Sequence, residues 1–138
     1  MSCRRKRDDD VSEEKCRILV VDDDPFVAEM LAVILDAEGY DVETAEDGPD
    51  ALAKFAAAPD TGLVISDMNM PGMTGLELIG KIRAANAEIP IILLTGSDDV
   101  DLGKEADEYL LKDEDLQDTI TVSVERVLEK HSMKTPNI

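Results

Sequence analysis

Several apolar runs of this sequence end at side chains that could take part in the transfer of a phosphoryl group. The side chains at these points are Asp22, Asp23, Asp24, Asp67, Thr95 and Lys112. Clustered carboxylates repel one another unless a cation lies among them, and an all-oxygen site with few protein ligands suits Mg²⁺. A carboxylate can also act as a nucleophile and accept a phosphoryl group as an acyl phosphate. A lysine can neutralise charge on the transferred oxygens, and a hydroxyl can hydrogen-bond one of them.

Taken one at a time, the same residues also have ordinary structural explanations. An aspartate that follows a strand can cap a helix or a turn, which would account for Asp22, Asp23, Asp24 and Asp67. Thr95 could be an ordinary strand end, and Lys112 could be a solvated lysine. Explaining the whole set in this way requires a coincidence at each of several successive strand ends. We therefore expect a single site that is built from all of these residues.

The apolar run that leads into Asp67 predicts a strand that is buried on both faces. Similar apolar runs, together with the mixed segment 40–45, predict five strands in all, over residues 18–21, 40–45, 63–67, 91–94 and 109–111. Strands that alternate with helices predict right-handed βαβ units, and hence an α/β fold with a doubly wound parallel sheet. Because the carboxyl ends of parallel strands share one edge of the sheet, the candidate residues should meet there.

Local signals predict where the helices begin and which faces they bury. Helix starts are predicted at Asp24-Pro25, Asp47-Gly48-Pro49, Thr74 with Glu77, and Asp113. Gly39 predicts the end of the first helix. The predicted buried faces are Val27, Met30, Leu31 and Ile34 in the first helix, and Leu116, Ile120, Val124 and Val127 in the last. Residues 119–124 also alternate like a strand, so both structures stay open for that stretch.

The composition predicts one soluble domain with a tail at each end. The chain has 138 residues, 43% of them hydrophobic, and no apolar run approaches the roughly 18 residues of a membrane span. A formal net charge of −18 argues against a nucleic-acid-binding surface, because phosphate contacts need lysine and arginine. Cys3 and Cys16 lack metal-type spacing, and we expect reduced thiols in a cytoplasmic protein. We expect tails over residues 1–15 and 132–138 and a domain over residues 16–131.

Four segments carry the candidate residues in a fixed order along the chain. They are Val20-Val21-Asp22-Asp23-Asp24, Ser66-Asp67-Met68-Asn69-Met70-Pro71-Gly72-Met73-Thr74-Gly75, Leu94-Thr95-Gly96 and Asp107-Glu108-Tyr109-Leu110-Leu111-Lys112. Together they resemble the receiver domain of two-component response regulators, over a stretch from about Cys16 to Lys130. The resemblance implies a flavodoxin-like sheet with the strand order 2-1-3-4-5, which the chemotaxis regulator of this family also has.

The resemblance also implies a Mg²⁺ site, with Mn²⁺ as a substitute ion. By this resemblance Asp22 and Asp23 form the acidic pair that holds the ion, Asp23 directly and Asp22 through water. Asp67 is the phosphoacceptor and a further metal ligand, and Asn69 supplies its backbone carbonyl. The phosphoryl group comes from a partner histidine kinase or histidine phosphotransfer protein. The single histidine of this chain, His131, lies in or beside the C-terminal tail and has no part in this chemistry.

Three further residues are implied to transmit the signal. Thr95 and Tyr109 form the switch pair of such domains, in which the hydroxyl moves toward the phosphoryl group while the ring turns inward. Lys112 contacts the phosphoryl oxygens. In physical terms, phosphorylation is a local electrostatic event that biases a surface with two states.

The sequence departs from the family pattern in two places. Asp113 follows Lys112 where the family usually has proline, so we expect a trans peptide bond there, because a non-proline cis bond costs about 2.5–4 kcal/mol. Only residues 96–111 separate Thr95 from Lys112, which is several fewer than usual. The missing length falls on the fourth helix, which we expect to be short or irregular over about residues 99–105. That helix belongs to the face that such domains present to partners.

We expect a stand-alone receiver that signals by phosphorylation-dependent binding to a downstream protein, rather than an enzyme. It could serve as a diffusible effector, as an intermediate of a phosphorelay or as a sink for phosphoryl groups. The alternative is a receiver fold that works as a scaffold without phosphorylation, which the short fourth helix and the missing proline suggest. An aspartate-nucleophile phosphatase of the haloacid dehalogenase type fits less well. Its general acid would fall at Asn69, which cannot carry the proton.

Overall fold

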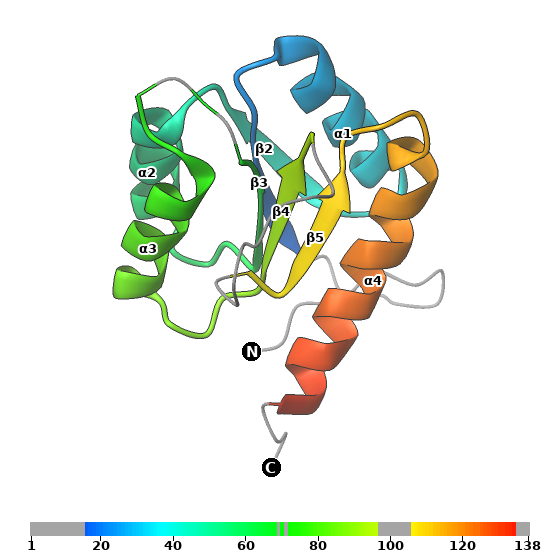
Figure 1. Cartoon of the computed structure of the whole chain (residues 1–138). Helices are drawn as coiled ribbons and strands as arrows, with labels where there is room; N and C mark the ends of the chain where they lie inside the picture. Colours follow the sequence, from blue (N-terminus) through cyan, green and yellow to red (C-terminus); the bar gives the residue numbers. More distant parts are fainter. Residues whose placement is uncertain (1–15, 69, 71, 97–105, 135–138) are drawn as a thin grey trace.

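The computed structural model describes residues 16–68, 70, 72–96 and 106–134, and side chains up to residue 130. Its elements, in chain order, are β1 (Arg17–Val21), α1 (Pro25–Ala37), β2 (Asp41–Ala45), α2 (Gly48–Ala57), β3 (Leu63–Asp67), α3 (Gly75–Ala85), β4 (Ile91–Thr95), β5 (Glu108–Leu111) and α4 (Leu116–Lys134). All neighbouring strands are parallel, in the order β2-β1-β3-β4-β5 (Figure 1). The predicted α/β sheet and its strand order are confirmed.

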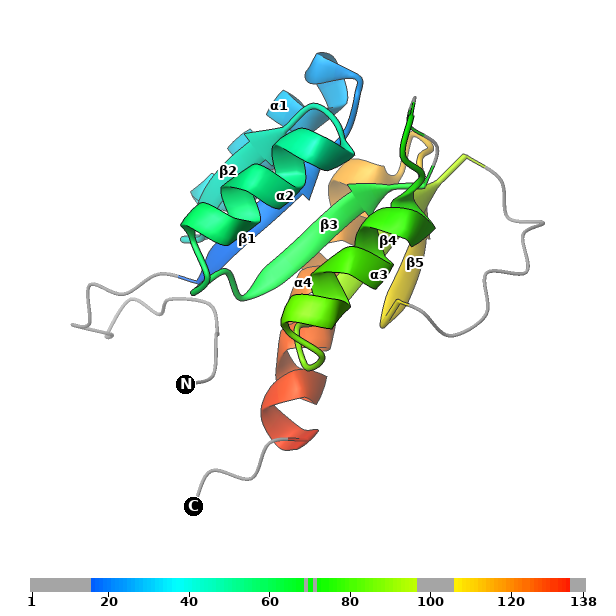
Figure 2. The same cartoon turned by 90° about the vertical axis from the view of Figure 1, so that its left-hand side faces the viewer.

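The sheet is covered on both faces, which gives the domain two apolar cores. Alternate residues of β1 point into different cores. Ile18 and Val20 pack with α1 and α4, whereas Leu19 and Val21 pack with α2 and α3. Figure 2 shows α2 and α3 side by side in front of the sheet, with α4 behind it. Because β1, β3 and β4 are buried on both faces, each carries an unbroken run of three or four apolar residues rather than an alternating pattern.

The helix starts agree with the capping signals in three of the four places. The Asp24 carboxylate accepts a hydrogen bond from the N–H of Phe26 at the start of α1, and Asp47 accepts one from Asp50 in α2. Thr74 and Glu77 form a complete capping box at the start of α3. The last helix differs from the prediction. It begins at Leu116, and the Asp113 carboxylate instead accepts a hydrogen bond from the N–H of Asp115, ahead of the helix.

The capping box of α3 supports a stability prediction. Thr74→Ala is expected to lower the free energy of unfolding by about 1 kcal/mol, because the N–H of Glu77 loses its 3.2 Å bond to the Thr74 hydroxyl. Urea denaturation with an unchanged slope would measure this loss. Thr74→Ser keeps the oxygen and is the matched control, with an expected loss of less than about half of that value. Equal stability of the alanine and serine variants would contradict the prediction.

The buried faces of the first and last helices were predicted with different success. In α4 the predicted Leu116, Ile120, Val124 and Val127 are all buried, so the helix is confirmed over the strand alternative. In α1 the fully buried residues are Ala28, Leu31 and Leu35, whereas Val27, Met30 and Ile34 are only partly covered. The predicted face of α1 therefore packs against the core, but Leu31 is its one fully buried member, and Ala28 and Leu35 were not predicted. Gly39 ends this helix with φ of 99°, in the left-handed region that glycine adopts without steric cost.

Further expectations concern the cysteines, the fourth helix and the tails. The expected reduced thiol at Cys16 is wrong in this structure, where Cys16 is buried and disulfide-bonded. The short fourth helix, predicted over about residues 99–105, and both tails up to residue 15 and from residue 135 lie outside the described residues. The last helix continues to Lys134. None of the helices in the described part of the chain is both long enough and apolar enough to cross a membrane.

Candidate functional site

The carboxyl ends of β1, β3 and β5 bring two aspartates and a lysine into direct contact. Asp22 follows β1, Asp67 is the last residue of β3, and Lys112 follows β5. The Lys112 ammonium lies 3.0 Å from Oδ2 of Asp22 and 3.3 Å from Oδ2 of Asp67. The side chain of Asp22 is fully buried and that of Asp67 nearly so, so the lysine neutralises charge where water has little access. The predicted meeting of these residues at one edge of the sheet is present in the structure.

Asp22 is held in place by bonds to two neighbouring segments. Its backbone N–H donates to the carbonyl of Ala45 at the end of β2, over 3.1 Å. Its carboxylate oxygen Oδ1 accepts a 2.9 Å bond from the N–H of Asp24, which itself caps α1. The buried carboxylate is therefore fixed in orientation as well as paired with Lys112.

Lys112 has a fixed orientation although Asp113, and not proline, follows it. Its backbone N–H donates to the carbonyl of Thr95 over 2.8 Å, which ties it to the end of β4. The described residues contain no cis peptide bond, so the expected trans bond between Lys112 and Asp113 is confirmed. A backbone bond to the neighbouring strand and two carboxylates thus orient the side chain.

The carboxylates also raise the pKa of Lys112 above its ordinary value of 10.5. Burial alone lowers the pKa of this ammonium, but its hydrogen bond and charge interaction with Asp22, and then those with Asp67, outweigh the burial. The raised pKa determines how the stability of the folded chain changes with pH. The charged lysine stabilises the folded chain at every pH below its unfolded pKa, and this stabilisation is lost as pH rises through the higher folded pKa.

Asp23 completes an acidic cluster that fits a divalent cation. One carboxylate oxygen from each of Asp22, Asp23 and Asp67 lies within 4.8 Å of the others, and Asp23 is exposed while its two neighbours are buried. Within the described ranges, Lys112 is the ammonium that pairs with two of these three carboxylates, so the formal negative charge exceeds the positive charge by two. Hard oxygen ligands with excess negative charge are what Mg²⁺ prefers. Asn69, the predicted backbone ligand, lies outside the described residues.

The predicted switch residues lie on the two strands that follow β3 in the sheet. Thr95 is buried at the end of β4, one residue beyond Leu94, which pairs with Asp67. Tyr109 is partly buried in β5 and packs against the core under α2 and α3. Its hydroxyl accepts a 3.3 Å hydrogen bond from the N–H of Ala106, just before the strand. Thr95 therefore lies at the same edge of the sheet as Asp67, whereas Tyr109 pairs with Leu93, two residues before the end of β4.

One residue of the site was not predicted from the sequence. Ser66 is completely buried in β3, and its hydroxyl donates a 3.0 Å bond to the backbone carbonyl of Asp67. The available signal was a hydroxyl that interrupts an apolar strand directly before the candidate phosphoacceptor.

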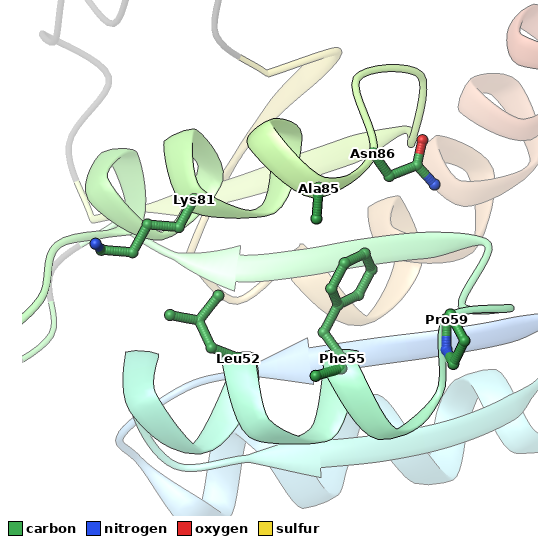
Figure 3. A pocket seen from close by; sticks show the side chains of 7 residues that line it. Leu52, Phe55, Pro59, Lys81, Ala85 and Asn86 are labelled. Carbon is green, nitrogen blue, oxygen red and sulfur yellow. The ribbon is translucent and has the colours of Figure 1, made fainter.

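A separate groove of about 340 Å³ lies between α2 and α3 (Figure 3). Its lining residues are Leu52, Phe55, Ala56, Pro59, Lys81, Ala85 and Asn86. The Leu52 and Phe55 side chains project from α2 into the space between the two helices (Figure 3). None of the candidate site residues lines this groove, so it is distinct from the acidic cluster.

Comparisons with known sequences agree with one another. A model of the response regulator receiver domain family matches residues 18–130. The DNA-binding response regulator MtrA of Mycolicibacterium smegmatis is 45% identical over 102 residues, which are 70% of this chain and 43% of MtrA. The probable transcriptional regulatory protein TcrX of Mycobacterium tuberculosis is 35% identical over 108 residues, which are 75% of this chain and 46% of TcrX. The chain thus spans less than half the length of these curated relatives.

Solved structures show the same similarity across most of the chain. The response regulator TrrA of Thermotoga maritima, in complex with Mg²⁺-BeF, is 43% identical with a TM-score of 0.73, over 80% of this chain and 97% of that one. A chemotaxis protein of Vibrio cholerae, CheY4, is 34% identical with a TM-score of 0.75, over 81% and 98%. Since the family model covers most of the sequence and the fold has the same topology, the chain belongs to the response regulator receiver domain family.

Proposed function

We propose that this chain accepts a phosphoryl group onto the carboxylate of Asp67 from a histidine of a partner kinase or phosphotransfer protein. The observation that supports this proposal best is the position of Asp67. It is buried, it lies 3.3 Å from the Lys112 ammonium, and it shares a cluster of carboxylate oxygens with Asp22 and Asp23. Receiver domains interact with histidine kinases, which gives the phosphodonor its chemical class.

The acidic cluster is the part of the site that we assign to Mg²⁺, or to Mn²⁺ in its place. Asp22, Asp23 and Asp67 would hold the ion, with the backbone carbonyl of Asn69 as a further ligand. A bound ion supplies positive charge beside the phosphoryl oxygens and so lowers the barrier to transfer.

The transfer itself needs one bond to form and one to break. An oxygen of the Asp67 carboxylate attacks the phosphorus, while the P–N bond to the partner's histidine breaks and its electron pair stays on the imidazole nitrogen. Lys112 then exchanges its contact with Asp67 for contacts with the transferred oxygens and keeps its 3.0 Å contact with Asp22. Burial of Asp67 limits the access of water to the acyl phosphate.

The signal would leave the site through Thr95 and Tyr109. A phosphoryl group on Asp67 offers new hydrogen-bond acceptors next to the end of β4, where Thr95 is buried. A shift of the Thr95 hydroxyl toward those oxygens frees space that the Tyr109 ring can take. The downstream partner is a protein, because a net charge of −18 opposes binding to nucleic-acid phosphates.

Intact mass after incubation with acetyl phosphate tests this function. The wild type is expected to gain the mass of one phosphoryl group with Mg²⁺ and none with a chelator. Asp67→Asn is expected to gain none under either condition, since the amide is not a nucleophile for phosphorus. A wild type that gains no mass and binds no Mg²⁺ would reject the proposal in favour of a phosphorylation-independent scaffold. Incorporation that persists in Asp67→Asn would place the acceptor elsewhere.

A further inference from the structure

The start of α3 is packed against the backbone of the phosphoacceptor strand more closely than any side chain would permit. A Cβ added at Gly75 would lie 2.5 Å from the carbonyl oxygen of Asp67 and 3.0 Å from the Cα of Met68. It would also lie 3.0 Å from a methyl carbon of Leu93 in β4. Real Cβ atoms essentially never show contacts under 3.0 Å. Gly75 does not have a positive φ, so position 75 requires glycine for space and not for backbone conformation.

Neither partner of this contact is free to move away. The N–H of Gly75 donates to the carbonyl of Met68 over 2.9 Å, which joins the helix directly to the end of β3. The N–H of Met68 donates to the carbonyl of Leu94 over 2.8 Å, which joins the same end of β3 to β4. On the other side, α3 is anchored in the core by Leu78, Ile79 and Ile82, which are buried.

A hydroxyl holds the same carbonyl group of Asp67 from within β3. Ser66 donates its 3.0 Å bond to this oxygen, which lies against Gly75. The backbone of Asp67 is therefore fixed by a hydrogen bond from Ser66, and α3 begins so close to it that no side chain fits at position 75. Its carboxylate, one side-chain length away, makes the 3.3 Å contact with Lys112.

We infer that Ser66 and Gly75 are positioning residues for phosphoryl transfer. Ser66 sets the place of the Asp67 carboxylate by bonding its backbone carbonyl, and Gly75 does so by letting α3 pack against that carbonyl without displacing it. This inference rests on the proposed function of Asp67. An alanine at position 75 forces α3 and the end of β3 apart by about half an ångström. A misplacement of about 1 Å at a reacting group can cost about a hundredfold in rate. We therefore expect Gly75→Ala to phosphorylate about tenfold more slowly or worse.

Gly80→Ala is a matched control on the same helix. Gly80 is exposed, and a Cβ added there meets nothing within 4 Å. Alanine also favours a helix over glycine, so this variant should melt at a higher temperature than the wild type and phosphorylate at the same rate.

The test is the rate of mass gain of the full chain at varied acetyl phosphate concentration, with saturating Mg²⁺ and well below each melting temperature. Gly75→Ala should lower the phosphorylation rate at saturating acetyl phosphate and leave the half-saturating concentration unchanged. Loss of stability alone does not produce this combination. A folded Gly75→Ala with the rate of Gly80→Ala would overturn the inference. If Gly75→Ala does not fold, the same rate measurement is made on Ser66→Ala, which should phosphorylate more slowly than the wild type. Ser123→Ala is its control, because Ser123 is equally buried but lies in α4. Equal rates of the two serine variants would also overturn it.

A crystal structure of the variant separates this inference from the proposed function. If the wild type takes up no phosphoryl group, the proposed function fails, but the geometric claim can still be judged. Gly75→Ala should then show the Asp67 carboxylate displaced and its 3.3 Å separation from Lys112 lengthened. A variant in which α3 has moved and that separation is unchanged would overturn the inference.

Discussion

Lys112→Met is expected to lower the phosphorylation rate of Asp67 by about 10²–10³-fold and to make the stability of the folded chain depend on Mg²⁺. The rate falls because the variant lacks the donor that offsets charge on the transferred oxygens. The stability falls because two carboxylates, Asp22 and Asp67, stay buried without their counterion. Removing one partner of a buried ion pair costs about 3–5 kcal/mol. We expect about 3, since 21% of the Lys112 side chain is exposed to solvent.

Urea denaturation with and without Mg²⁺ measures the second effect. Mg²⁺ should restore a large part of the lost stability in Lys112→Met, because an ion that binds only the folded chain also offsets the unpaired charge. Lys54→Met is the control: Lys54 is half-buried, pairs with Asp50 one helical turn away on α2 and donates to the backbone carbonyl of Thr44. Its loss should cost about 1–2 kcal/mol and leave no fully buried carboxylate without its lysine. A Lys112→Met variant as stable as Lys54→Met, with no response to Mg²⁺, would show that Lys112 does not balance the buried carboxylates.

The sequence predicted the features that depend on local patterns. A strand buried on both faces is mostly apolar, so β1, β3 and β4 could be recognised from a short apolar run each. The parallel arrangement places the carboxyl ends of all five strands at one edge, which is why the meeting of Asp22, Asp67 and Lys112 there could be predicted before any coordinates. Their direct ion pairs could not be predicted. Capping by Asp24, Asp47 and Thr74 is equally local.

The features that the sequence did not predict depend on how elements pack against one another. In α1 nearly every position is apolar, so periodicity alone could not choose between faces, and Leu35 is buried where Ile34 was predicted. Asp113 has the residue type of a cap, but the chain makes a turn there before α4 begins at Leu116. The role of Gly75 follows only from the distance between α3 and β3, which no local pattern encodes.

Two adjacent aspartates allow direct metal coordination to be separated from general electrostatic attraction. Asp23 and Asp24 are both exposed, and each substitution to alanine removes the same charge from the same edge of the sheet. Only Asp23 belongs to the cluster of carboxylate oxygens within 4.8 Å, whereas the carboxylate of Asp24 accepts the N–H of Phe26 and caps α1. The two variants therefore lose the same charge, but only Asp23→Ala loses a carboxylate of the acidic cluster.

Asp23→Ala is expected to weaken Mg²⁺ binding by more than about a hundredfold, because even changes to residues that only support a metal ligand cost about 10–100-fold. Asp24→Ala should keep the affinity within a few-fold and lose about 1 kcal/mol of stability through the missing cap. Titration calorimetry at 0.15 M salt, where exposed charges are screened beyond about 8 Å, measures both affinities. Equal weakening in the two variants would mean that the acidic edge attracts the ion only through its overall field. Unchanged affinity in Asp23→Ala would remove Asp23 from the metal site and leave the buried Asp22 and Asp67 as its carboxylate ligands.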